Sequence, residues 1–121
     1  MARVLVVDDD ENIREFVSLA LLGEGHEVDV ASNGAVALNV VQTITPDVIL
    51  LDMRMPVMDG WQFASAYREI PGRHAQLVVM TAARDAARSG AEISADANLA
   101  KPFELDELLD LVDKLAAQAR S

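Results

Sequence analysis

Short runs of strand length alternate along this chain with longer segments in which apolar residues recur at helical spacing. Five runs predict strands: residues 4–7, 28–31, 48–51, 77–80 and 97–100. The first, third and fourth runs are apolar throughout, which is typical of strands that are covered on both faces of a sheet. The second run is more polar and predicts an edge strand, and the fifth is a weak strand pattern.

Between the runs, apolar residues lie three and four positions apart, which predicts amphipathic helices. The predicted helices cover residues 13–21, 37–44, 63–70, 85–92 and 105–115. Gly23, Pro46 and the pair Pro71-Gly72 follow the first three helices, and these residue types end helices. The fourth helix is Ala-rich and is expected to be short.

Five repeats of strand and helix predict an α/β fold, a doubly wound parallel sheet of five strands with helices on both faces. The 121 residues suit one domain, 1–121, and no linker, repeat or low-complexity segment divides them. In open sheets of this kind, ligands bind beyond the carboxyl ends of the strands. The residues that follow the strands are therefore the first candidates for function.

Charged and polar side chains follow four of the five runs. Asp8 and Asp9 follow the first run, Asp52 the third, Thr81 the fourth and Lys101 the fifth. Carboxylates gathered at one edge of a sheet repel one another and raise each other's pKa values, which destabilises the fold unless a cation binds. The pattern therefore indicates a divalent cation, and such an ion makes the site a candidate for phosphoryl chemistry.

Composition narrows the classes of function. Acidic residues number 20 against 10 Lys plus Arg, a net charge of −10, which argues against direct binding of nucleic acid. No apolar run approaches the ~20 residues of a membrane span, and nothing after Met1 has the pattern of a signal peptide. Cysteine is absent, so disulfides are excluded. We expect a soluble cytoplasmic protein whose partners offer a basic or apolar patch.

Five motifs occur in order along the chain: Val6–Asp10, Pro46–Pro56, Met58–Gly60, Met80–Ala82 and Lys101–Phe103. In this order and at this spacing, the chain resembles the receiver domains of two-component response regulators over essentially its whole length. The resemblance implies a flavodoxin-like (βα)5 fold with strand order 2-1-3-4-5. It also implies a Mg2+-dependent transfer of a phosphoryl group from a phosphohistidine of a sensor histidine kinase or phosphotransfer protein.

The resemblance assigns a role to each acid. Asp52 is implied to be the phosphoacceptor, a carboxylate nucleophile that forms an acyl phosphate. Asp9 and Asp52 are implied ligands of Mg2+, and Asp8 acts partly through bound water. The main-chain carbonyl of Arg54 is the further implied ligand. The implied activity is phosphorylation and dephosphorylation of the chain itself at Asp52, not that of an enzyme with turnover.

The resemblance also assigns the phosphoryl contacts and the downstream partner. Thr81 is implied to donate its hydroxyl to the phosphoryl group, and Lys101 to place its ammonium there. A cis peptide is implied between Lys101 and Pro102. Downstream proteins are implied to bind the face formed by the fourth helix, the fifth strand and the fifth helix. The chain is either a stand-alone regulator or phosphorelay carrier, or a piece of a larger protein.

Three positions bear on switching and on the lifetime of the phosphoryl group. Asn98 stands where the family usually carries an aromatic that moves inward, and an amide in an apolar pocket loses its hydrogen bonds with water. Arg54 and Ala83 are implied to line the path of the hydrolytic water. A long, cationic Arg54 can lie over the phosphoryl group, which predicts slow self-dephosphorylation.

Two other functions remain open. The pair Asp8-x-Asp10 after an apolar strand is similar to the aspartate-nucleophile phosphatases of haloacid dehalogenase type, although Asp10 also suits the first turn of a helix. A phosphorylation-independent interaction module would keep the fold without the chemistry. Outside the motifs, His26 and His74 show no partner pattern and are expected to face solvent, and Trp61 is expected to be partly buried.

Overall fold

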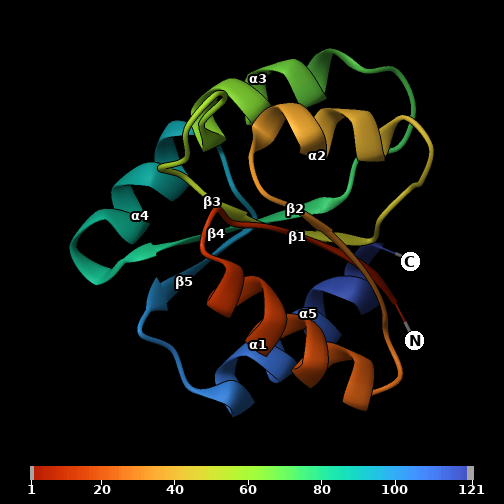
Figure 1. The fold of residues 1–121 in the computed structure, drawn as a ribbon, viewed down its shortest axis with the longest axis vertical. Coiled ribbons are helices and arrows are strands. Elements are labelled where there is room, and N and C mark those ends of the chain that lie inside the picture. The colour runs from red at the N-terminus through yellow and green to blue at the C-terminus, as the bar shows by residue number, and fades with distance from the viewer. Residues whose placement is uncertain (1, 120–121) are drawn as a thin grey trace.

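The computed structural model describes residues 2–119 (Figure 1). The strands are β1 (Arg3–Val7), β2 (Glu27–Ala31), β3 (Val48–Asp52), β4 (Gln76–Ala82) and β5 (Ala97–Lys101). The helices are α1 (Glu11–Gly23), α2 (Gly34–Val41), α3 (Gly60–Glu69), α4 (Ala83–Glu92) and α5 (Leu105–Ala119). Within the described range, no helix is both long and apolar enough to cross a membrane.

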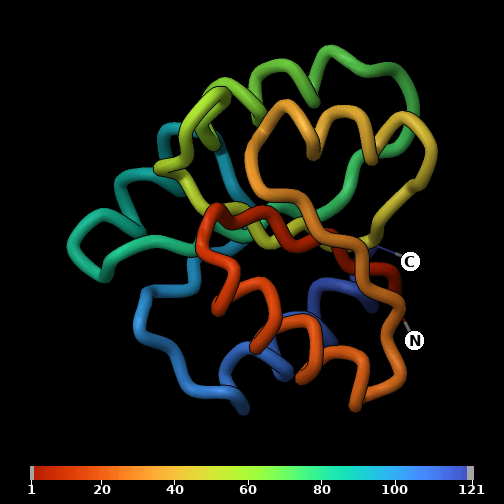
Figure 2. Tube along the Cα trace, viewed as in Figure 1, coloured from red at the N-terminus to blue at the C-terminus, as the bar shows by residue number. Residues whose placement is uncertain are grey.

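The strands form one parallel sheet in the order β2-β1-β3-β4-β5, which confirms the predicted fold and strand order. Helices α1 and α5 cover one face of the sheet, and α2 and α3 cover the other (Figures 1 and 2). Helix α4 lies against β4 and β5, near one edge of the sheet. The polar strand β2 forms the opposite edge, as its sequence predicted.

Alternate side chains of the central strands enter two separate cores. Val4 and Val6 of β1 pack in the core beneath α1 and α5. Leu5 and Val7 pack in the core beneath α2 and α3. The four apolar residues of β3 are divided between the two cores in the same way, and every residue of this strand is buried. Burial on both faces explains the unbroken apolar runs, and it fixes the register because a slip of one residue would exchange the two faces.

Polar side chains cap the N-termini of three helices. Asp10, Asn33 and Asp59 precede α1, α2 and α3, and each accepts hydrogen bonds from N–H groups of the first turn. Helix α2 ends at Val41, earlier than the predicted end at Ile44. The apolar spacing continues past the helix end, but the proline two residues after Ile44 disfavours helical backbone just before it. The chain therefore leaves the helix and turns toward β3.

The prediction that His26 faces solvent is wrong, because its ring is buried. Its Nδ1 accepts a hydrogen bond from the N–H of Ala2 at 3.0 Å. The proton of the neutral ring therefore lies on Nε2, which donates to Asp113 of α5 at 3.0 Å. The imidazole thus joins the beginnings of β1 and β2 to α5. His74 is exposed, as predicted.

Replacing His26 by Leu is expected to lower the free energy of unfolding by about 1–3 kcal/mol, because the buried N–H of Ala2 loses its acceptor. Thermal unfolding of His26→Leu beside His74→Leu would measure this effect. The exposed His74 offers a matched control: its replacement removes a hydrogen bond to the carbonyl of Ile70 and an edge contact with the Tyr67 ring, both made by an exposed side chain, so it is expected to change stability by about 1 kcal/mol or less. Equal losses in the two variants would contradict the assigned role of His26.

Candidate functional site

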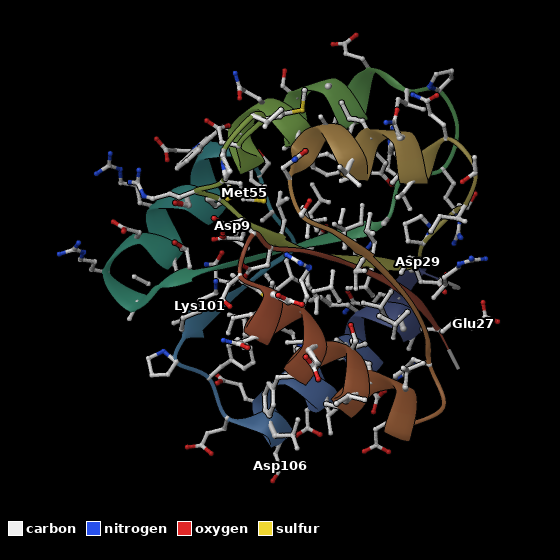
Figure 3. The ribbon with its side chains drawn as sticks, viewed as in Figure 1. Asp9, Glu27, Asp29, Met55, Lys101 and Asp106 are labelled. Atoms are coloured by element: carbon white, nitrogen blue, oxygen red, sulfur yellow. The ribbon has the colours of Figure 1, made fainter. Side chains whose placement is uncertain are left out.

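The predicted site residues lie together at the end of the sheet where the carboxyl ends of four parallel strands meet. This end, the carboxyl edge, is distinct from the outer strands β2 and β5. The residues that precede Asp8 and Asp52 are paired in the register of β1 and β3, so these two acids leave neighbouring strands at the same level. Thr81 follows the register partner of Asp52, and Lys101 follows the partner of Thr81. Figure 3 shows Asp9 and Lys101 on the same side of the molecule, near α4.

Three carboxylates gather at this edge. One oxygen from each of Asp8, Asp9 and Asp52 lies within 4.8 Å of the other two. Asp8 is fully buried, Asp52 is nearly so, and Asp9 is exposed. Burial raises the pKa of Asp52 from 3.8 to about 6, and the charges of Asp8 and Asp9 contribute to the rise. Three carboxylate donors with a raised carboxyl pKa fit a hard divalent cation such as Mg2+.

The ammonium of Lys101 contacts two of these carboxylates. Its Nζ lies 2.7 Å from Oδ2 of Asp8 and 3.8 Å from Oδ1 of Asp52. The other oxygen of Asp8 accepts a hydrogen bond from the N–H of Asp10 at 2.9 Å. Lys101 therefore offsets part of the repulsion in the cluster and lowers the pKa of Asp52. Thr81 is buried beside this group, and the Lys101–Pro102 peptide is cis, as predicted.

Arg54 adjoins Asp52, but its side chain extends over an aromatic ring. Its backbone N–H donates to the Asp52 carboxylate. Its Cζ lies 5.6 Å from the centroid of the Trp61 ring, within the range of a cation–π contact. Trp61 is partly buried, as predicted, and its indole N–H donates to Glu92 at the end of α4 at 3.2 Å. To lie over the Asp52 carboxylate, the guanidinium of Arg54 would therefore have to leave the Trp61 ring.

The two other positions that the sequence predicted to bear on switching and lifetime lie on α4 and β5. Ala83 is the exposed first residue of α4, which follows β4 directly and starts two residues before the predicted start. Asn98 is exposed on β5, and its amide packs against Gly90 of α4, where a Cβ would overlap it. With its nitrogen directed toward the helix, this amide donates to the carbonyl of Ala86 at 3.2 Å. A polar contact therefore joins β5 to α4 at the position where the family usually has an aromatic.

Two further residues support the site, and Val57 lies in the loop between β3 and α3. A Cβ at Gly60 would lie 2.8 Å from the carbonyl oxygen of Asp52, so only glycine allows α3 to begin this close to β3. Arg14 donates to the carbonyl oxygen of Asp8 at 2.8 Å. Val57 has a φ of 70°, which is strained for a β-branched residue. Gly60 belongs to the motif Met58–Gly60, but no sequence signal marks the role of Arg14.

Comparison with known proteins agrees with this geometry. The family model described as response regulator receiver domain matches residues 4–113. The transcriptional regulatory protein PcoR of Escherichia coli is 36% identical over 124 residues, which cover 100% of this chain and 54% of PcoR. The chain thus spans about half the length of that relative. Sporulation initiation phosphotransferase F of Bacillus subtilis is 35% identical over 114 residues, which cover 93% of this chain and 91% of the relative.

A solved structure shares the fold. The receiver domain of the Francisella response regulator 1452 superposes with a TM-score of 0.87 at 30% sequence identity, covering 98% of each chain. The family match extends from β1 into α5 and includes every strand of the sheet and each of the site residues described above. The chain therefore belongs to the family of response regulator receiver domains, the receiver modules of two-component systems.

Proposed function

We propose that residues 1–121 form one receiver domain that accepts a phosphoryl group on Asp52 in a reaction that requires Mg2+. The donor is a phosphohistidine of a sensor kinase or phosphotransfer protein. The observation that carries the proposal is the convergence of three carboxylates within 4.8 Å of one another with the ammonium of Lys101. A nucleophile, a set of metal ligands and a cation for phosphoryl oxygens thus lie at one place.

Asp52 is the nucleophile in this proposal. Its carboxylate oxygen forms a bond to phosphorus while the bond from phosphorus to the donor imidazole nitrogen breaks, and that nitrogen keeps the electron pair and remains on the donor. With a pKa of about 6, Asp52 is mostly ionised at neutral pH even without a cation. Lys101 contributes positive charge near the new phosphoryl oxygens, and the hydroxyl of Thr81 donates to one of them.

Asp8, Asp9, Asp52 and the main-chain carbonyl of Arg54 are the groups that would hold Mg2+. When bound, Mg2+ supplies the positive charge that offsets a phosphoryl group of roughly −1.5 to −2 charges. The buried Asp8 is oriented by Lys101 and by the N–H of Asp10, so this part of the ligand set is already in place.

Incubation with Mg2+ and acetyl phosphate, followed by intact-mass spectrometry, tests the proposal. We expect one labile phosphoryl group on the wild-type chain and none on Asp52→Asn. Asp110→Asn, on the exposed surface of α5, is the matched control and is expected to label normally. Labelling that persists in EDTA or in Asp52→Asn would overturn the proposal.

The phosphatase alternative is less well supported. The Asp10 side chain accepts hydrogen bonds from the N–H groups of Asn12 and Ile13 and caps α1. It is therefore engaged in the helix rather than free to act as the second acid of an Asp-x-Asp pair. Steady turnover of phosphomonoesters would favour that alternative, and a chain that never labels would favour the interaction module.

The phosphoryl group is expected to be lost slowly, and Arg54→Ala is expected to lose it several-fold faster. A guanidinium over the phosphoryl oxygens can hold them and obstruct water, whereas Ala83 offers no polar group to orient water. The rate of loss after removal of the donor measures this effect. Arg88→Ala, on the exposed surface of α4, is the control and is expected to decay like the wild type. Equal decay of Arg54→Ala and wild type would contradict the prediction.

Receiver domains act between histidine kinases and downstream effector domains. For this chain, we place the downstream partner on the face formed by α4, β5 and α5. The net charge of −10 supports a protein partner rather than direct binding of nucleic acid by these 121 residues. We also place the domain in the cytoplasm, without membrane association.

A further inference from the structure

Arg54, Trp61 and Glu92 form a continuous series of contacts from the loop after Asp52 to the end of α4. The guanidinium carbon of Arg54 lies 5.6 Å from the centroid of the Trp61 ring. The indole N–H of Trp61 donates to Oε1 of Glu92 at 3.2 Å. The backbone N–H of Arg54 is bound to the Asp52 carboxylate. The backbone of Arg54 therefore lies beside Asp52, while its guanidinium lies on the Trp61 ring.

Open space surrounds this series of contacts. Trp61 and Arg54 line a hollow of about 370 Å3 in the loop after Asp52. Met55, labelled in Figure 3, also lines this hollow. A second hollow of about 340 Å3, between α3 and the end of α4, is lined by Trp61 and Glu92. The guanidinium and the indole can therefore move without displacing buried side chains.

The strengths of the two possible contacts of Arg54 differ. An exposed cation–π contact is weak, and the guanidinium of Arg54 is exposed. A dianionic phosphoryl group on Asp52 would offer the same guanidinium a bidentate, charge-assisted pair, which is stronger. Phosphorylation would therefore draw Arg54 away from the ring of Trp61.

The other end of the series lies where α4 is anchored. Arg68 of α3 donates to the carbonyl oxygens of Ile93 and Ser94, directly after α4. The first turn of α4 has no capping side chain. The contact between Trp61 and Glu92 thus reaches α4 at the end that α3 holds in place.

We propose that Trp61 is a positioning residue that holds Arg54 away from Asp52 in the unphosphorylated chain and conveys phosphorylation to the end of α4. The inference rests on the proposed acceptor role of Asp52. When the phosphoryl group forms, Arg54 exchanges the ring for phosphoryl oxygens, and the indole and its hydrogen bond to Glu92 rearrange. The contact between Trp61 and Arg54 therefore stabilises the unphosphorylated state relative to the phosphorylated state.

A double-mutant cycle with beryllofluoride and Mg2+ tests the holding role. Binding is followed by fluorine NMR, which does not depend on tryptophan emission. We expect Trp61→Leu to bind beryllofluoride roughly two- to fivefold more tightly than wild type, the factor that an exposed cation–π contact corresponds to. In the Arg54→Ala background, Trp61→Leu is expected to change nothing. Equal gains in the two backgrounds, or no gain beside wild-type Arg54, would overturn the inference.

Trp61→Phe is the control for a purely structural effect of replacing Trp61 on beryllofluoride binding. It keeps an aromatic face for Arg54, so its gain in affinity is expected to be smaller than that of Trp61→Leu. An equal or larger gain for Trp61→Phe would count against the holding role.

Amide NMR of Ile93 and Ser94 tests the connection to α4. Beryllofluoride is expected to shift both signals in the wild-type chain and to leave them unchanged in Arg54→Ala. Shifts that persist in Arg54→Ala would overturn the inference. If Asp52 is not the phosphoacceptor, no variant binds beryllofluoride in the fluorine spectrum. Failure of the proposed function is therefore distinguishable from failure of this inference.

Discussion

Replacing Asp52 by Asn is expected to raise the melting temperature of the metal-free chain at neutral pH, and the gain is expected to vanish in acid. Burial and the charge of Asp8 raise the pKa of Asp52 from 3.8 to about 6. Between these values, the folded chain binds more protons than the unfolded chain, so stability falls as pH rises toward 6. The ionised carboxylate then destabilises the fold by roughly 3 kcal/mol, which corresponds to on the order of 10 °C.

Thermal unfolding in EDTA, from about pH 4 to about pH 8, measures this effect. Asn keeps an oxygen for the N–H of Arg54 but carries no charge, so the gain is expected to appear as pH rises through 6. Asp9→Asn is expected to give a smaller gain, because Asp9 is exposed. Asp110→Asn serves as the exposed control. A gain that is independent of pH, or a lower melting temperature, would count against the acidic-cluster explanation.

Replacing Lys101 by Met is expected to destabilise the chain at neutral pH. Asp8 is fully buried, and Lys101 supplies the ammonium 2.7 Å from its carboxylate. Removing one partner of a buried ion pair costs about 3–5 kcal/mol, and the partial exposure of Lys101 places the expected loss near the lower value. Because Lys101 also lowers the pKa of Asp52, its loss raises that pKa further, so the destabilisation is expected to increase with pH.

Chemical denaturation of Lys101→Met beside Lys114→Met measures the effect, since Lys114 is an exposed lysine of α5. Adding Asp8→Asn to Lys101→Met is expected to recover most of the lost stability, because the unpaired buried charge is removed. Equal losses in the two lysine variants, or no recovery in the double variant, would show that the ion pair does not stabilise the fold.

The sequence by itself determined the elements and the edge of the sheet at which the polar side chains meet. Strands buried on both faces must be apolar throughout, so their ends are visible where the first acids follow, at Asp8 and Asp52. Parallel strands bring their carboxyl ends to the same edge, which also placed Thr81 and Lys101 there. The polar composition of β2 likewise predicted that it is an outer strand of the sheet.

Only the tertiary structure decided which partner each polar side chain meets. Lys101 lies closer to Asp8 than to Asp52, Arg54 lies on Trp61, and His26 is buried against α5. A long or ring-bearing side chain can reach several partners, and the alternatives differ by about 1 kcal/mol, so local pattern does not select among them. The choice depends on residues brought together by packing from distant parts of the chain, as Ala2, His26 and Asp113 are.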